Sequence, residues 1–180
     1  PAPQQPRATR GPWFAWGKTA VPVKTVWGLV AGAKANAGKL NGAAASSGSS
    51  SRLASERLQL DAGVAMQLMP DKGSTPALTD VMGGQVQMMI DAVPAMAPNV
   101  AENQVRALAT TGQTRSTVLP SVPTVIESGI AGYEATIWLG LMAPAGTPKP
   151  VSEKSNAAVN EAVKRPDIGK LWTQHGAVPM

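Results

Sequence analysis

The feature that most constrains the fold is an order of segments that repeats along the middle of the chain. A short apolar segment is followed by a turn of small residues and then by apolar residues at helical spacing. The pattern predicts strands over residues 39–44, 64–69, 86–91 and 105–109, with helices after the first two and a short helix over residues 96–101 after the third. Because strands that alternate with helices form right-handed βαβ units, this order predicts an α/β fold with a mostly parallel sheet and helices on both faces.

The two ends of the chain show other patterns. Residues 1–20 are rich in Pro and Gly, and we expect them to form an irregular arm. Thr25 is the expected N-cap of the helix that follows it, and Ser74 or Thr75 is the expected cap of the helix that has Pro76 near its first turn. Beyond the fourth strand, a loop region is expected to lead into one long strand over residues 133–143, which crosses away from the main sheet. Helices are predicted over residues 151–163 and 167–175.

Composition excludes several kinds of site and partner. The sequence has no Cys and a single His, His175, so we expect no disulfide, no metal and no cofactor. No apolar run reaches the roughly 18 residues of a membrane span, and the first residues show no signal-peptide pattern. The net charge is +5, but Lys and Arg are scattered singly along the chain. This distribution predicts a solvated basic surface and no nucleic-acid partner.

The loop after the first predicted strand is a candidate anion site. Residues 45–51 carry only Ala, Gly and Ser, and they lie between a strand end and a helix start. Backbone N–H groups at a helix start have no partner within the helix, and small side chains let an anion approach them. Gly48, Ser49 and Ser50 are therefore candidate ligands of a carboxylate or phosphate. The alternative is a plain Ser-rich loop in which Ser49 only caps the helix.

Two further candidates follow the next two strands. Lys72 and Gly73 precede the second helix, where they either bring a positive charge to its start or form an ordinary turn. Asp91 ends the third strand, where it either accepts a hydrogen bond from a ligand or caps the next helix. Because the carboxyl ends of parallel strands meet at one edge of a sheet, all three positions are expected to line a cleft for a small polar molecule.

The residues favour a solute-binding protein over an enzyme. His175 lies near the end of the last predicted helix without an acidic neighbour, and no Gly-x-Ser-x-Gly motif is present. Two alternatives stay open. One is an α/β enzyme for small molecules in which Asp91 and Lys72 act as acid and base, and the other is a fragment that binds no ligand.

Several motifs occur in an order that resembles the substrate-binding receptors of tripartite tricarboxylate transporters, the Bug-type proteins. The resemblance covers residues 21–179. The motifs are Gly48-Ser49-Ser50 at a helix start, Lys72-Gly73-Ser74, Pro76-Ala77-Leu78-Thr79-Asp80, Gly83-Gly84-Gln85-Val86, Asp91, Gly132-Tyr133-Glu134, and the run Gly-Leu-Met-Ala-Pro-Ala-Gly-Thr-Pro at residues 140–148.

This resemblance implies a two-lobed fold of the type II periplasmic-binding-protein kind. A small carboxylate-bearing solute would lie between the lobes, and the protein would present it in the periplasm to membrane permease subunits. The carboxylate-binding loops of the family fall on the same six positions, Gly48, Ser49, Ser50, Lys72, Gly73 and Asp91. The implied organisation is an arm over residues 1–20, lobe 2 over residues 21–128, and the returning strand and last helices of an incomplete lobe 1 over residues 129–180.

The chain also departs from the family pattern. Nothing before Val21 matches the strand and Pro-Gly-Gly loop with which the family usually opens, so most of the first half of lobe 1 is expected to be missing. Gly42 stands where the family often has Tyr, and Ala92 where it often has Asn. An incomplete lobe predicts uncovered apolar surface, and hence self-association or completion by another chain. The expected uncovered residues are Ile137, Trp138, Leu139 and Leu141.

Overall fold

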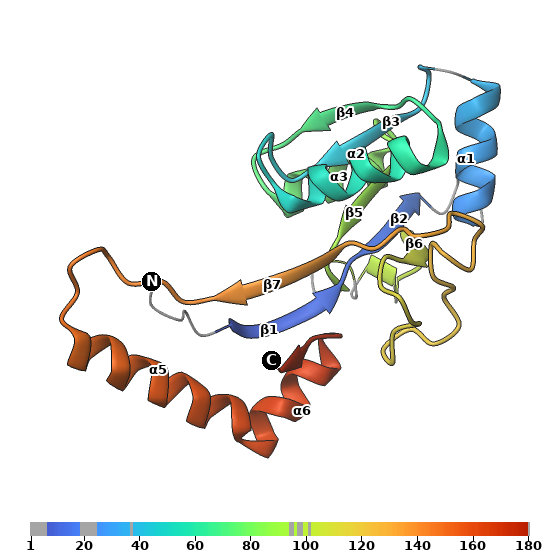
Figure 1. Ribbon diagram of the computed structural model, residues 1–180. Helices are drawn as coiled ribbons and strands as arrows, with labels where there is room; N and C mark the ends of the chain where they lie inside the picture. The colour runs from blue at the N-terminus through green and yellow to red at the C-terminus, as the bar shows by residue number, and fades with distance from the viewer. Residues whose placement is uncertain are drawn as a thin grey trace.

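The computed structural model describes residues 7–18, 25–36, 38–93, 96, 99–100 and 102–179 (Figure 1). Its strands are β1 (Arg7–Pro12), β2 (Phe14–Lys18), β3 (Asn41–Ala44), β4 (Gln67–Pro70), β5 (Met88–Asp91), β6 (Val105–Thr110), β7 (Thr136–Gly140) and β8 (Val178–Pro179). Its helices are α1 (Val26–Ala35), α2 (Ser50–Ala62), α3 (Ser74–Gly83), α5 (Lys149–Lys164) and α6 (Pro166–Gln174). The strands form two separate sheets.

The larger sheet has five strands in the order β4-β3-β5-β2-β6. β3 pairs in parallel with both β4 and β5, whereas β2 is antiparallel to both β5 and β6. The four strands that the sequence pattern predicts therefore lie in one sheet and run in the same direction. The predicted mostly parallel sheet is confirmed, and β2 is an additional strand within it.

The prediction of an irregular arm is wrong for residues 7–18, because these residues form β1 and β2. Phe14 and Trp16 are fully buried in β2, with ring centroids 5.4 Å apart. The indole N–H of Trp16 donates a hydrogen bond to the backbone oxygen of Asp91 at 3.0 Å. The short strand segments are flanked by Pro and Gly, and their partners lie far along the chain, so no local periodicity reveals them.

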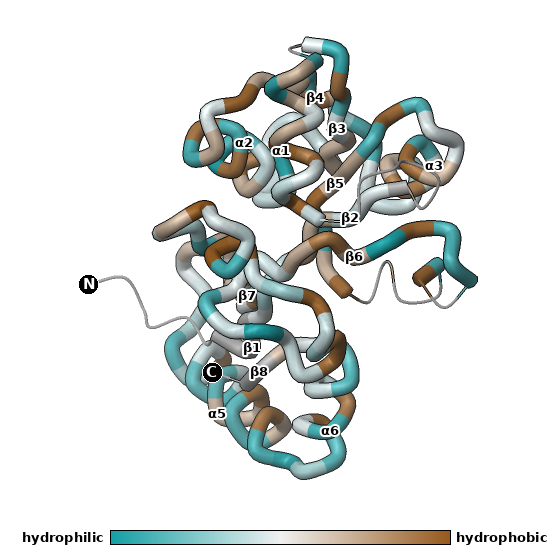
Figure 2. Tube along the Cα trace, turned by 90° about the vertical axis from the view of Figure 1, so that its right-hand side faces the viewer, coloured by the Kyte–Doolittle hydropathy of each residue, from teal (hydrophilic) through white to brown (hydrophobic). Residues whose placement is uncertain are grey.

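Helices cover both faces of the larger sheet, as predicted. α1 and α2 lie on one face and α3 lies on the other (Figure 2). Leu29 of α1 and Leu58 of α2 pack with Ile90 in one buried cluster, whereas Leu78 of α3 packs with Met89 in the other. Successive residues of β5 thus point to opposite faces. α1 begins after Thr25, whose hydroxyl accepts a hydrogen bond from the backbone N–H of Gly28 at 3.1 Å, so the predicted N-cap is confirmed.

The smaller sheet has the antiparallel order β7-β1-β8, and α5 and α6 lie along one side of it (Figure 1). Both helices were predicted, but neither has a buried residue. Trp138, Leu139 and Leu141 are exposed, as predicted for an incomplete lobe. Ile137 was expected to be exposed as well, but it is half-buried because it packs against the core of the larger sheet.

The chain passes between the two sheets at two neighbouring places. One is Trp13, between β1 and β2, and the other is Ala135, just before β7. Both are held by Thr111, the residue that directly follows β6. The backbone N–H of Thr111 donates to the oxygen of Trp13 at 2.8 Å, and its backbone oxygen accepts from the N–H of Ala135 at 3.0 Å. The short helix expected over residues 96–101 falls largely outside the described residues.

Candidate functional site

The starts of α2 and α3 lie at one edge of the larger sheet, although the two helices cover opposite faces. At the start of α2, the hydroxyl of Ser51 donates a hydrogen bond to the backbone oxygen of Ile90 at 2.5 Å. In the loop before α3, the backbone N–H of Asp71 donates to the oxygen of Ala44, at the end of β3, at 2.8 Å. Asp91 directly follows Ile90. The structure therefore brings the three predicted segments to the same edge.

In the loop before α2, backbone amides are more accessible to an anion than the Ser49 hydroxyl is. The hydroxyl of Ser49 is engaged in capping the helix, since it accepts from the N–H of Arg52 at 3.3 Å and donates to the oxygen of Ser46 at 2.9 Å. The alternative prediction, an N-cap, thus describes the Ser49 side chain. Gly48 is exposed, and a Cβ placed on it would meet nothing within 4 Å. Ser50 is exposed, and its hydroxyl makes no hydrogen bond within the described residues.

The start of α3 has no side-chain cap. The cap was expected at Ser74 or Thr75, but the structure places Gly73 at this position, with a φ of 134°. Glycine is favoured there because other residues rarely adopt this φ, and it leaves no side chain to bond the first amides of the helix. A Cβ on Gly73 would also meet nothing within 4 Å. Lys72, the predicted cation of the site, is exposed beside this open helix start.

Asp91 is the most deeply buried of the candidate residues, with 5% of its surface exposed. Its Oδ1 accepts a hydrogen bond from the N–H of Ala92 at 2.7 Å. Its Oδ2 is buried and makes no hydrogen bond of normal geometry. Burial raises the pKa of the Asp91 carboxyl, and the nearby hydroxyl of Ser74 and the amide of Ala92 offset part of this rise. The carboxylate at the end of β5 thus lies beside Ser74, the first residue of α3.

Two further side chains of this edge were not singled out as ligands by the sequence. Ser74 was considered only as a cap, yet its hydroxyl lies near the Asp91 carboxylate. Asp71, in the loop before α3, also has a buried Oδ2 without a hydrogen bond. Burial raises the pKa of Asp71, and the negative charge of Asp80 adds to this rise. Neither contact has a sequence signal, because each depends on how a turn folds back on the sheet.

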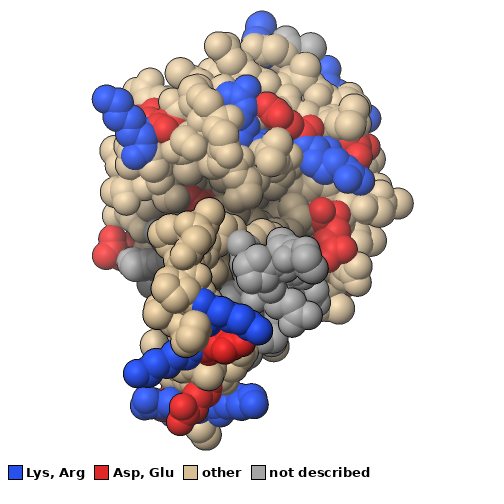
Figure 3. Space-filling view, turned by 60° about the vertical axis from the view of Figure 1, so that its left-hand side comes forward, with Lys and Arg blue, Asp and Glu red and all other residues tan. Residues whose placement is uncertain are grey.

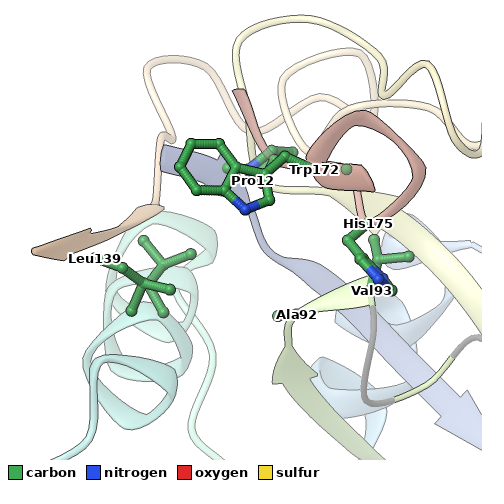
Figure 4. A pocket seen from close by; sticks show the side chains of 10 residues that line it. Pro12, Ala92, Val93, Leu139, Trp172 and His175 are labelled. Carbon is green, nitrogen blue, oxygen red and sulfur yellow. The ribbon is translucent and has the colours of Figure 1, made fainter. Parts of the chain in front are cut away.

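A mainly apolar cavity of about 260 Å³ lies between the two sheets, and none of the six predicted site residues lines it (Figure 4). Ala92 and Val93, which follow Asp91, form its wall on the side of the larger sheet. Pro12, Leu139 and Trp172 line it from the smaller sheet and α6. A second cavity of about 380 Å³ shares Pro12 and has a more polar lining that includes Arg115 and Glu134. Two hollows therefore lie where the sheets meet.

His175 lines the apolar cavity, near the end of α6 (Figure 4). It is exposed, and the structure shows no acidic partner for it among the described residues. This position fits the predicted helix-end His, since His175 is the C-cap residue of α6.

Side chains of opposite charge lie side by side on the surface. On the face shown in Figure 3, Lys and Arg lie next to Asp or Glu and do not gather into one basic patch. The ion pairs include Arg115–Glu127 at 2.9 Å and Arg52–Glu56 at 2.7 Å. Within the part of the chain that the structure describes, no group of three or more His, Asp or Glu residues is placed to hold a metal ion.

None of the described helices combines the length and the apolar character that crossing a membrane requires.

Comparison with known proteins identifies the relatives of this chain. Residues 10–180 match the profile described as "Tripartite tricarboxylate transporter family receptor". A protein of Pseudomonas sp. strain P51, described as a UPF0065 protein in the tcbD-tcbE intergenic region, is 42% identical over 149 residues. Protein BugT of Bordetella pertussis is 36% identical over 152 residues. These alignments cover 82% and 84% of this chain but 44% and 47% of the relatives, so the chain spans about half of their length.

Solved structures share the fold closely. An R. palustris protein solved with adipate superposes with a TM-score of 0.92 at 30% identity, over 97% of this chain and 59% of that one. MatC from Rhodopseudomonas palustris with bound malate gives a TM-score of 0.88 at 32% identity, over 97% and 60%. The periplasmic binding protein BugD gives 0.90 at 32% identity, over 98% and 60%. The periplasmic-binding-protein-like α/β fold is confirmed, and the family and these structural relatives are solute-binding receptors, not enzymes.

Proposed function

We propose that this chain, which belongs to the tripartite tricarboxylate transporter receptor family, binds a small carboxylate-bearing solute between its two sheets. The observation that carries the proposal is that two helix starts, at Gly48–Ser50 and at Gly73, lie at the sheet edge where β5 ends, and that Ala92 and Val93, which follow β5, line a cavity between the sheets. The relatives solved with adipate and with malate support a carboxylate as the ligand.

The carboxylate of the solute would be held by backbone amides at these two helix starts. Each helix dipole contributes about 0.3–1 kcal/mol toward a negative group, and hydrogen bonds from the amides contribute more. The open space at Gly48 and Gly73 lets the anion approach the backbone closely. The exposed hydroxyl of Ser50 and the ammonium group of Lys72 would add donors at the rim.

The remainder of the solute would extend toward the apolar cavity. Val93, Leu139 and Trp172 line this space and offer no charge to a second ionic group. Burial of apolar area contributes about 25 cal/mol per Å² to binding. A solute with a polar end and a short carbon body therefore fits this combination of surfaces.

The family also supports a transport role. We place the protein in the periplasm and propose that it delivers the solute to membrane permease subunits, as the family description and the periplasmic relative BugD suggest. In this arrangement residues 21–128 correspond to lobe 2, with β2 added to its sheet, and residues 129–180 correspond to the returning part of lobe 1, with β1 added to its sheet. Because the chain spans about half the length of its relatives, we also propose that the exposed apolar surface near Leu139 and Leu141 is covered by another polypeptide, a second copy of this chain included.

Thermal unfolding in the presence of adipate and of malate tests the proposal. A ligand at a hundredfold excess over its dissociation constant stabilises a protein by about 2.7 kcal/mol. Gly48→Val should abolish this stabilisation while the unfolding of the free protein stays the same, because a side chain there meets no protein atom. Gly169→Val is the matched control, since Gly169 lies in α6 with equally open surroundings. Absence of stabilisation by every carboxylate tested would refute the proposed function.

A further inference from the structure

We infer that β7 is a docking strand for a second copy of this chain, whose own β7 pairs antiparallel with it and joins the two smaller sheets into one. The inference rests on the proposed function, because it names the polypeptide that covers the apolar surface near Leu139 and Leu141. Three observations carry it: a repeat within the fold, the lack of edge protection on β7, and the exposed apolar side chains of this segment.

The two sheets are built in the same way around the crossing segments. β1 leads through Trp13 into β2, and β6 leads, after a loop, through Ala135 into β7. In the larger sheet the entering strand β2 pairs antiparallel with the leaving strand β6 on one side and with β5 on the other. In the smaller sheet the entering strand β7 pairs antiparallel with the leaving strand β1, and no described residue pairs with its other side (Figure 1). The repeat therefore predicts an antiparallel strand at the free side of β7, in the position that β5 holds beside β2.

β7 also lacks the residues that protect the other free edges of the two sheets. Edge strands of natural proteins often carry Pro or a charged side chain, which discourages the addition of a further strand. β4 ends at Pro70, β6 contains Arg106 and β8 ends at Pro179. By contrast, residues 135–148 include no Lys, Arg, Asp or Glu, and β7 itself contains no Pro. The edge of β7 is therefore suited to pairing with another strand.

A second copy of the chain meets the requirements of this edge. A two-fold axis places the same strand antiparallel to itself, which is the direction that the repeat within the fold requires. Because residues 135–148 are uncharged, this self-pairing opposes no like charges. When the pairing is centred on Trp138, the middle residue of β7, Ile137 lies opposite Leu139 of the partner subunit on one face. The two Trp138 side chains then lie side by side on the other face.

The exposed side chains of this segment set the strength of the pairing. Trp138, Leu139, Leu141 and Met142 are each more than half exposed. A large apolar side chain that is half exposed presents on the order of 100 Å² to solvent, so the four present roughly 400 Å² before main-chain atoms are counted. A standard interface buries about 800 Å² on each partner, so this contact lies at the small end of specific interfaces. We therefore expect a dimer with a dissociation constant in the micromolar range.

Variants with a single Cys test the pairing, because the chain has no Cys of its own. In Trp138→Cys the two thiols lie directly across the two-fold axis, with Cα atoms about 4.5–5.5 Å apart, which a disulfide can bridge. We expect mild oxidation to convert most of this variant into a covalent dimer. In Leu139→Cys the two Cα atoms lie diagonally, more than about 7 Å apart, so this variant should form no covalent dimer. Leu60→Cys is the control for random collision, since Leu60 lies on α2 and is more exposed than either residue, and it should form none.

Charged variants test the same contact without a disulfide, and they serve if a Cys variant does not fold. Trp138→Lys and Trp138→Glu should each sediment as a monomer, because like charges then meet at the axis, and an equimolar mixture of the two should recover the dimer. Disulfides at all three Cys positions or at none of them, a wild-type chain that stays monomeric at every concentration, or a mixture that stays monomeric overturns the inference.

Thermal stabilisation by adipate and by malate tests the proposed function separately. The measurement is made on monomeric Trp138→Lys as well as on the wild type, since Trp138 lines neither of the two cavities between the sheets. Stabilisation of a chain that forms no β7 pair overturns the second copy as partner and leaves solute binding standing. A β7-paired dimer that neither acid stabilises supports the pairing and counts against solute binding.

Discussion

The side-chain hydroxyl of Thr111 lies 2.6 Å from the backbone oxygen of Ala135, one of the two places where the chain passes between the sheets. The same hydroxyl contacts the other crossing, since it lies 2.9 Å from the oxygen of Trp13 and accepts from the N–H of Trp13 at 2.8 Å. Thr111 is fully buried. One side chain therefore holds the two crossing segments at a fixed distance from each other.

Replacing this hydroxyl should destabilise the protein. We expect Thr111→Val to lower the free energy of unfolding by about 1–3 kcal/mol, because the N–H of Trp13 loses a buried acceptor. Thr111→Ser keeps the hydroxyl and is the control. Urea unfolding followed by Trp fluorescence measures both. A Thr111→Val variant as stable as Thr111→Ser would show that the two crossings do not depend on this side chain.

The buried carboxyl of Asp91 should make stability depend on pH. Because its pKa is raised from the ordinary value of 3.8 in the folded protein, its contribution to stability is greatest below that value and is lost as the pH rises through the raised pKa. Asp91→Asn should therefore raise the free energy of unfolding by about 1–3 kcal/mol near neutral pH. The gain should disappear at about pH 3, where the wild-type carboxyl is protonated as well. Thermal melts across this range measure the effect, and a gain that grows toward low pH would contradict it.

Tyr133 links the loop before β7 to α2. Its ring is fully buried, and its hydroxyl donates to the backbone oxygen of Ala54 at 2.9 Å. Burial raises the pKa of this phenol, so the hydroxyl stays protonated and able to donate. Tyr133→Phe should lower the free energy of unfolding by about 0.5–1.5 kcal/mol, as measured by urea unfolding. A loss much larger than this would indicate that the ring has moved and not only lost its hydrogen bond.

The uncovered apolar surface of the smaller sheet should cause association. Leu141 and Met142 follow β7 with 59% and 67% of their surfaces exposed. We expect the apparent mass in sedimentation to rise with concentration, because apolar patches of this kind find partners. The double replacement Leu141→Ser and Met142→Ser should reduce the association. Leu60→Ser is the control, since Leu60 is 78% exposed on α2, outside the smaller sheet. A chain that stays monomeric at millimolar concentration would contradict the prediction.

Sequence periodicity predicted the parts of the fold in which neighbouring residues decide the structure. α2 begins after Ser49 and α1 after Thr25 because each cap uses a side chain that bonds an amide three residues later. β2 escaped prediction because its partners, Asp91 and Thr110, lie far along the chain. A five-residue segment bordered by Pro and Gly carries no local sign of such pairing.

The sequence predicted where the candidate site lies better than it predicted the hydrogen bonds within the site. The edge where Gly48, Gly73 and Asp91 meet follows from the direction of parallel strands, which the pattern of segments already indicates. The unpaired Oδ2 of Asp91 does not follow from any pattern, because it depends on which donors the folded chain leaves within reach. The engagement of the Ser49 hydroxyl in a cap is likewise a matter of local geometry.

The central position of β2 in the larger sheet has a consequence for how the protein folds. The bond from the Trp16 indole to Asp91 spans 75 positions of sequence, and β2 lies between β5 and β6. Units built from β3, α2, β4 and α3 make mostly local contacts, so they can form early, whereas closing long loops to place β2 slows the later steps. During synthesis β2 leaves the ribosome long before either neighbour exists. β2 is therefore made before both of its partners and is paired late, and until then its Phe and Trp side chains are exposed to chaperones and to aggregation.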